Sequence, residues 1–111
     1  MKEMMSVQDA DAALGEATAL VFKHSTQCPI SANARREMES LLSGGEPVPV
    51  YMVDVNDRRD VSDYVAERTG IEHQSPQVIV VRGGQAGWHA DRFDITAQSV
   101  REGLGLASSG G

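Results

Sequence analysis

Residues 19–31 read Ala19-Leu20-Val21-Phe22-Lys23-His24-Ser25-Thr26-Gln27-Cys28-Pro29-Ile30-Ser31. The first four are an apolar run typical of a strand buried on both faces. From Ile30 onward, apolar residues recur at the spacing of one helix face. Pro29 suits the start of that helix, because the N–H that proline lacks would be unpaired there anyway. Free N–H groups and the positive end of the helix dipole are then expected to face the Cys28 sulfur and lower its pKa.

Cys28 is the single cysteine of the chain, so an intramolecular disulfide is impossible and any disulfide must join another molecule. A lone cysteine is often a small buried hydrophobic residue. A position at the mouth of a helix favours a reactive thiol instead. The residues alone leave both interpretations open.

The whole chain has the size and composition of one globular domain. It has 111 residues, of which 41% are hydrophobic and 23% charged. We expect a single domain over residues 1–111, with flexible ends at 1–5 and 106–111. The formal charge of −6 disfavours nucleic acids and anionic membranes as partners. With no apolar run of about 20 residues and no signal-peptide pattern, a cytoplasmic location is expected.

The remaining pattern alternates strands and helices. Turn signals at Ser43–Pro47, Gly70 and Gly83-Gly84 separate the elements. The last pair of strands forms a hairpin, since only two residues join them. The elements expected are helix 6–17, strand 18–23, a helix from Pro29 to Leu42, strand 48–55, a helix opened by Asp57 or Asp60 and closed by Gly70, strand 76–82, strand 85–90 and a helix capped by Thr96. This order predicts an α/β fold with a four-stranded mixed sheet flanked by helices, and Cys28 at the C-terminal end of the first strand.

Several spaced motifs carry a family resemblance over roughly residues 20–104. They are Phe22-Lys23-His24-Ser25-Thr26-Gln27-Cys28-Pro29-Ile30-Ser31, His73-Gln74-Ser75-Pro76-Gln77-Val78, Trp88-His89 and Asp94-Ile95-Thr96. Together they resemble the monothiol bacilliredoxins, a family of the thioredoxin-like superfamily. The resemblance implies a thioredoxin-like fold in which Ser75-Pro76 is a cis peptide bond facing the active cysteine.

The resemblance also implies a reaction. Cys28 would be the nucleophile that removes bacillithiol, a low-molecular-weight thiol, from S-bacillithiolated client proteins. Bacillithiol would be a co-substrate, with no tightly bound cofactor. Ser31 stands where a dithiol enzyme has its second cysteine, so it can donate a hydrogen bond to the thiolate but cannot resolve a mixed disulfide. Thr26 and Pro29 belong to the same motif, and Ser75-Pro76 would dock an extended substrate.

The malate group of bacillithiol calls for cations, and Lys23, His24 and Arg92 are candidates by position near the strand ends. His24 is also a candidate for lowering the Cys28 pKa. The alternatives for each are a surface charge and a loop histidine. The three histidines and the cysteine do not fall at metal-ligand spacings, so no metal site is expected.

Two other functions stay open on the sequence. One is a non-catalytic thioredoxin-fold module that binds an extended peptide at Ser75-Pro76, with Cys28 buried and inert. The other is a glutaredoxin-like carrier of an iron–sulfur cluster shared between two chains. Thiol–disulfide exchange requires a depressed Cys28 pKa. The peptide-binding module predicts that Cys28→Ser leaves function intact, and the cluster carrier predicts a brown protein on anaerobic purification.

Overall fold

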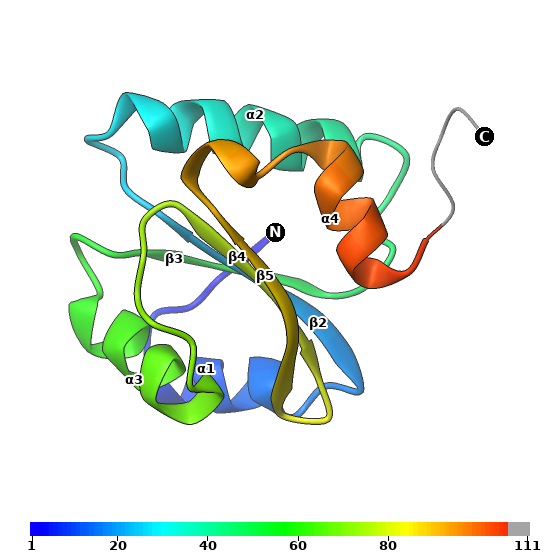
Figure 1. Cartoon of the computed structure of the whole chain (residues 1–111). Helices are drawn as coiled ribbons and strands as arrows, with labels where there is room; N and C mark the ends of the chain where they lie inside the picture. Colours follow the sequence, from blue (N-terminus) through cyan, green and yellow to red (C-terminus); the bar gives the residue numbers. More distant parts are fainter. Residues whose placement is uncertain (107–111) are drawn as a thin grey trace.

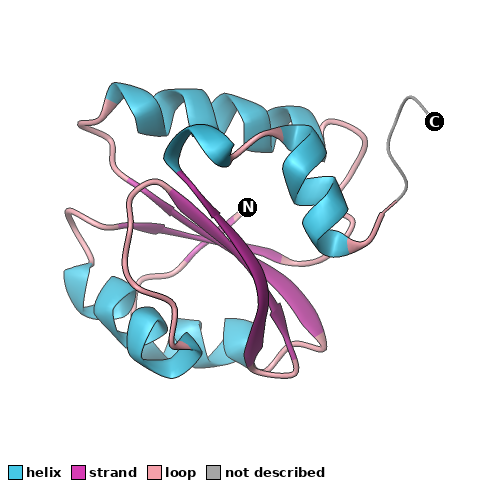
Figure 2. Ribbon diagram, viewed as in Figure 1, coloured by secondary structure: helices cyan, strands magenta, loops and turns pink. Residues whose placement is uncertain are grey.

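The computed structural model describes residues 1–106, and within this range a five-stranded mixed sheet carries helices on both faces (Figures 1 and 2). The strand order is β1-β3-β2-β4-β5. The sheet consists of β1 (Lys2–Glu3), β2 (Thr18–His24), β3 (Val50–Asp54), β4 (Gln77–Arg82) and β5 (Gln85–Asp91). β3 runs parallel to both β1 and β2, whereas β4 is antiparallel to its neighbours β2 and β5. The α/β architecture is confirmed, and the prediction of four strands is corrected to five.

The additional strand, β1, lies in the segment 1–5 that the sequence analysis expected to be flexible. Lys2 pairs with Tyr51 and Glu3 with Met52 at the edge of the sheet. Met4 follows and is fully buried among the side chains under α1 and α3. The pattern gave no sign of this strand, because its two residues are charged and exposed.

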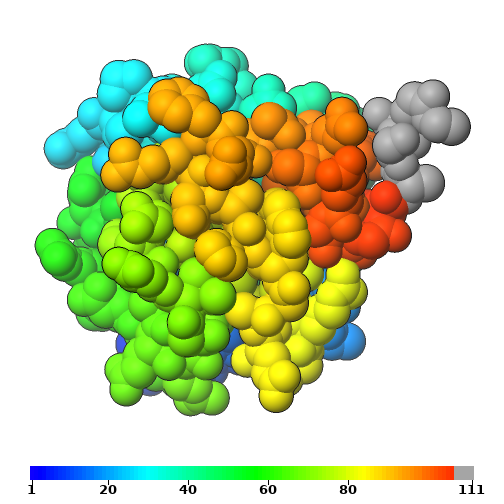
Figure 3. All heavy atoms as spheres, in the orientation of Figure 1, coloured from blue at the N-terminus to red at the C-terminus, as the bar shows by residue number. Residues whose placement is uncertain are grey.

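Two helices cover each face of the sheet. α1 (Val7–Leu14) and α3 (Arg59–Thr69) pack on one face, and α2 (Pro29–Leu42) and α4 (Ala97–Leu104) pack on the other (Figure 1). A short 3-10 helix, η1 (Arg92–Asp94), joins β5 to α4 and lies against α2, as the space-filling view also shows (Figure 3).

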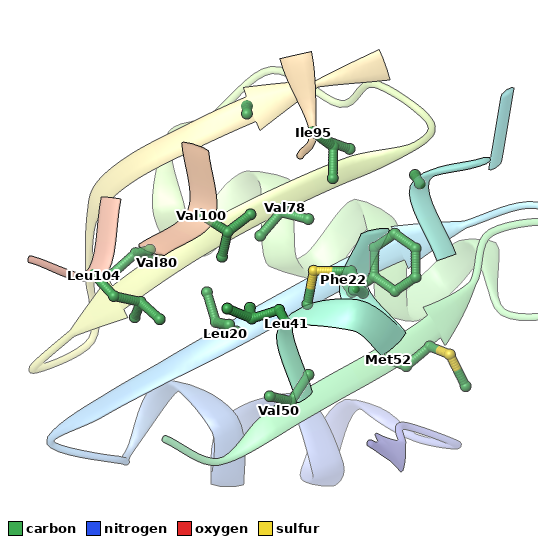
Figure 4. Close-up of a cluster of buried hydrophobic side chains, with 13 residues drawn as sticks. Leu20, Phe22, Leu41, Val50, Met52, Val78, Val80, Ile95, Val100 and Leu104 are labelled. Atoms are coloured by element: carbon green, nitrogen blue, oxygen red, sulfur yellow. The ribbon is translucent and has the colours of Figure 1, made fainter. Parts of the chain in front are cut away.

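The core has two halves because side chains of a strand alternate between faces. Along β2, Leu20 and Phe22 point toward α2 and α4, whereas Ala19 and Val21 point toward α1 and α3. Figure 4 shows the first half, in which Leu20 and Phe22 of β2 lie with Val50 and Met52 of β3 and with Val78 and Val80 of β4. Because of this alternation, consecutive residues at the end of β2 point to opposite faces of the sheet.

Element boundaries differ from the predictions by a few residues. The first helix ends at Leu14, since Gly15 terminates it, and β3 begins at Val50, after the two prolines at 47 and 49. Prolines cannot donate to the hydrogen-bond ladder, which explains the late start. The predicted tail 106–111 lies outside the described residues except for Leu106. Among the helices described, none has the length and apolar character needed to cross a membrane.

Candidate functional site

Cys28 is the N-cap residue of α2, directly after the loop that follows β2. Its backbone is extended, with φ −113° and ψ 123°, and Pro29 is the first helical residue. Cys28 is partly exposed as a residue, so it is not sealed in the core. The cysteine therefore lies at the strand–helix junction that the sequence predicted.

The surroundings of the sulfur favour its thiolate form. The pKa of Cys28 lies below its ordinary value of 9.0, chiefly because of a hydrogen bond from the backbone N–H of Ser31, with the N–H of Ile30 second. Partial burial opposes this shift, whereas the positive charge of Arg92 and the Ser31 hydroxyl reinforce it. N–H groups at the start of a helix have no partner within the helix, which leaves them available to a thiolate.

Ser31 is buried, at 2% exposed, and it holds the loop as well as facing the sulfur. Its Oγ accepts a hydrogen bond from the Ser25 N–H at 3.0 Å. Because an acceptor bond uses a lone pair, the hydroxyl proton remains free for the Cys28 sulfur. Ser25 in turn accepts from the Asn56 amide at 2.7 Å, which ties this loop to the one after β3.

Ser75-Pro76 is a cis peptide bond, as predicted. The Pro76 carbonyl accepts a hydrogen bond from the Arg92 N–H at 2.9 Å, which joins the start of β4 to η1. The sheet pairing of β4 begins only at Gln77, so Ser75 lies outside the ladder. Arg92 thus connects the two parts of the site, because its backbone holds Pro76 and its charge acts on Cys28.

Beside Cys28 is a pocket of about 200 Å³. Its lining residues are His24, Ser25, Thr26, Cys28, Ser31, Ala32 and Arg35. The structure therefore gathers four of the predicted site residues in one cavity, whereas Pro29, Ser75, Pro76 and Arg92 lie outside its lining. Arg35 was missed, although it follows Ser31 by four residues and so shares its helix face.

His24 is a poor candidate for a cation. It is 5% exposed, its ring stacks on Phe22, and its Nε2 is a buried atom without a hydrogen-bond partner among the described residues. Burial is the main cause that lowers the pKa of His24 below 6.5, so the ring is neutral at neutral pH. A neutral ring can offer a hydrogen bond to a ligand, but it adds no positive charge to stabilise the Cys28 thiolate.

Lys23 does not line the pocket. It follows Phe22 and precedes His24, so its side chain leaves the opposite face of the sheet. There it is fully buried, and its Nζ lies 3.1 Å from the Ser62 carbonyl oxygen and 3.3 Å from Nδ1 of His73. The expectation that Lys23 and His24 serve the same ligand is therefore wrong, because consecutive strand residues face opposite ways.

A five-stranded sheet between two helical layers, with one cysteine at the start of α2 and a cis-proline before β4, defines a monothiol protein of the thioredoxin fold. A family model described as monothiol bacilliredoxin BrxC matches residues 1–100. The chain belongs to this family, and it is a thiol redox protein.

Solved structures agree with this assignment. A thioredoxin-fold protein described as a candidate oxidoreductase is 31% identical, with a TM-score of 0.86 over 93% of this chain and 92% of that one. Trxlp from Edwardsiella tarda is 18% identical, with a TM-score of 0.71 over 97% and 100%. Thioredoxin from Trypanosoma brucei brucei is also 18% identical, with a TM-score of 0.72 over 92% and 85%. The latter two support the fold alone.

Proposed function

We propose that this protein removes bacillithiol from protein mixed disulfides by monothiol exchange through Cys28. The observation that carries the proposal is the partly exposed Cys28 at the start of α2, where the N–H groups of Ser31 and Ile30 lower its pKa. The thiolate is the nucleophile of disulfide exchange, so this environment raises the reactive fraction near neutral pH.

In the first step, the Cys28 thiolate attacks the bacillithiol sulfur of a client mixed disulfide. A bond forms between Cys28 and bacillithiol, and the client sulfur leaves as a thiolate that takes a proton from water. One disulfide replaces another, so no net oxidation occurs. The Arg92 charge that stabilises the starting thiolate also favours an approaching anionic adduct.

In the second step, a low-molecular-weight thiol must free Cys28, because the chain has no second cysteine. Its thiolate attacks the bacillithiol sulfur, Cys28 leaves as a thiolate, and a small-molecule disulfide is released. Over the two steps the incoming thiol is oxidised to the disulfide level and the client sulfur is reduced to a thiol, while the bacillithiol sulfur stays in a disulfide throughout. Ser31 can donate a hydrogen bond to the leaving Cys28 thiolate.

The other site residues are assigned supporting roles. His24, Thr26 and Arg35 line the cavity in which the small thiol would lie, with Arg35 as its cation. Ser75-Pro76 would receive the client chain beside the sulfur. We expect the partners to be client proteins in the cytoplasm, and we expect neither nucleic acid nor membrane as a partner.

Intact-protein mass spectrometry after incubation with oxidised bacillithiol tests the proposal. The wild type is expected to gain the mass of one bacillithiol on Cys28, and reduced thiol added afterwards is expected to remove it. Cys28→Ser is the control and should gain nothing. A wild-type protein that stays unmodified, or an adduct that no small thiol removes, would contradict monothiol exchange.

A further inference from the structure

Lys23 is a buried cation for which the exchange reaction has no direct use. Its side chain is fully buried on the face of the sheet covered by α1 and α3, away from Cys28. Burial is the main cause that lowers the pKa of Lys23 to about 8, although Asp63 and Asp91 raise it. Burying an ammonium group is costly unless its hydrogen bonds are satisfied. The partners of Lys23 therefore indicate what it does.

One partner, His73, belongs to the connector 71–75 between α3 and β4. Its Nδ1 lies 3.3 Å from the Lys23 Nζ and 3.0 Å from the Ser62 Oγ. An ammonium group has only donors, so Nδ1 must be the acceptor and the ring must be neutral. Burial first, and the Lys23 charge second, lower the pKa of His73 and so keep it in that state.

Glu72, the connector residue before His73, is also held by a hydrogen bond from a buried side chain, that of Gln77. Gln77 is fully buried and stands opposite Lys23 in the pairing of β2 with β4. Its Nε2 donates to the Glu72 carbonyl at 2.9 Å and to the Asp91 carboxylate at 2.8 Å. One cross-strand pair therefore holds two consecutive connector residues, Glu72 and His73, and only Gln74 separates them from Ser75.

We infer that Lys23 and Gln77 are positioning residues that hold the connector 71–75, and thereby Ser75, at the distance from Cys28 that a client chain requires. Neither residue is among the groups that shift the Cys28 pKa. Their effect should therefore fall on the binding of an extended substrate and spare the intrinsic reactivity of the thiol. This inference rests on the proposed function, because it assumes that Ser75 receives the client.

The test compares two disulfides of 2-mercaptoethanol, only one of which carries a peptide. One is bis(2-hydroxyethyl) disulfide, and the other is an unstructured peptide whose single cysteine is disulfide-linked to 2-mercaptoethanol. Free 2-mercaptoethanol is present in both assays as the thiol that releases Cys28. The main variant is His73→Ala, since His73 is exposed enough to be replaced without a hole in the core. We expect KM for the peptide to rise roughly 3- to 10-fold, as for one lost hydrogen bond, with the rate on the small disulfide and the Cys28 alkylation midpoint unchanged.

His73→Gln should bring the KM for the peptide most of the way back to the wild-type value, because the glutamine amide oxygen can accept a hydrogen bond from the Lys23 ammonium group. Glu67→Ala, an exposed change on α3, is the matched control and should alter neither substrate. Hydrogen exchange should show faster exchange across 71–75 in His73→Ala and in Lys23→Met.

Equal losses on both substrates, a moved Cys28 midpoint, or an unchanged peptide KM would each overturn the inference. A wild type that takes up no bacillithiol in the mass-spectrometry experiment would refute the proposed function, and the inference with it, whereas normal uptake with an unchanged peptide KM in His73→Ala would refute the inference alone.

Discussion

Gly103→Ala offers a sharp test of how α4 is seated on the sheet. Gly103 lies in the last turn of α4, and a Cβ atom added there would lie 2.4 Å from Cδ2 of Trp88, 2.5 Å from Cε3 and 2.8 Å from Cε2. Carbon atoms in ordinary contact are about 3.5–4.0 Å apart. The indole ring or the helix must therefore move by more than about 1 Å to admit one methyl group.

Two opposing terms set the size of the effect. Alanine is the better helix former, which contributes up to about 1 kcal/mol and less near a helix end. Overpacking a filled site typically costs about 1–3 kcal/mol. Because the obstacle is a half-buried ring and not the tip of a flexible chain, we expect the clash to dominate, with a net loss of about 1–2 kcal/mol and a fall in Tm of roughly 4–12 °C.

Urea unfolding followed by circular dichroism measures the free energy of unfolding. Trp88 is the single tryptophan of the chain, so its fluorescence reports on the ring itself. Gly44→Ala is the matched control, since nothing lies within 4 Å of a Cβ placed there. In a Trp88→Leu background, Gly103→Ala should cost much less. A Gly103→Ala protein as stable as the wild type would show that the indole does not lie over this glycine.

Three further outcomes are expected. The pH midpoint of Cys28 alkylation by iodoacetamide should lie below 9.0, and Ser31→Ala should raise it; a wild-type midpoint at 9.0 or above would contradict the helix-mouth argument. The Lys23 pKa is about 8 in the folded protein and 10.5 ordinarily, so the unfolded chain holds this proton more tightly. The free energy of unfolding of the wild type, relative to that of Lys23→Met, should therefore rise as the pH increases from about 8 to 10.5. The rise is at most about 3 kcal/mol, and less where water screens the charge. A flat difference in urea unfolding over that range would count against a buried ammonium group. Thr96→Ala should cost about 1 kcal/mol by removing the N-cap of α4, and since Thr96 and Ser99 bond each other's backbone N–H groups, the loss should not add to that of Ser99→Ala in a double-mutant cycle.

The order of elements could be predicted from the sequence because each long element carries its own periodicity. The turn at Gly83-Gly84 and the helix start at Pro29 were visible in the same way, and both lie where expected. β1 was not predictable, since two charged residues show no alternation and only their pairing with β3 makes them a strand.

The site was predictable in part. The cysteine, its serine and the cis-proline follow from short motifs; the structure shows Cys28 as the N-cap of α2 and Ser75-Pro76 as a cis peptide bond. The error lay in grouping Lys23 with His24 as ligands of one anion, although the alternation of a strand separates them. Arg35 was missed, because its place in the pocket beside Cys28 also depends on how α2 packs on the sheet.

Both edges of the sheet have features that hinder the addition of a further strand from another chain. On one side the outermost strand, β1, is only two residues long and carries a lysine and a glutamate; on the other, the pairing of β4 with β5 slips between Val80 and Val81. Short charged strands and bulges deter chains from stacking side by side into fibrils. A two-residue strand at one edge and an interrupted pairing at the other therefore offer an incoming chain only a short or irregular ladder to extend.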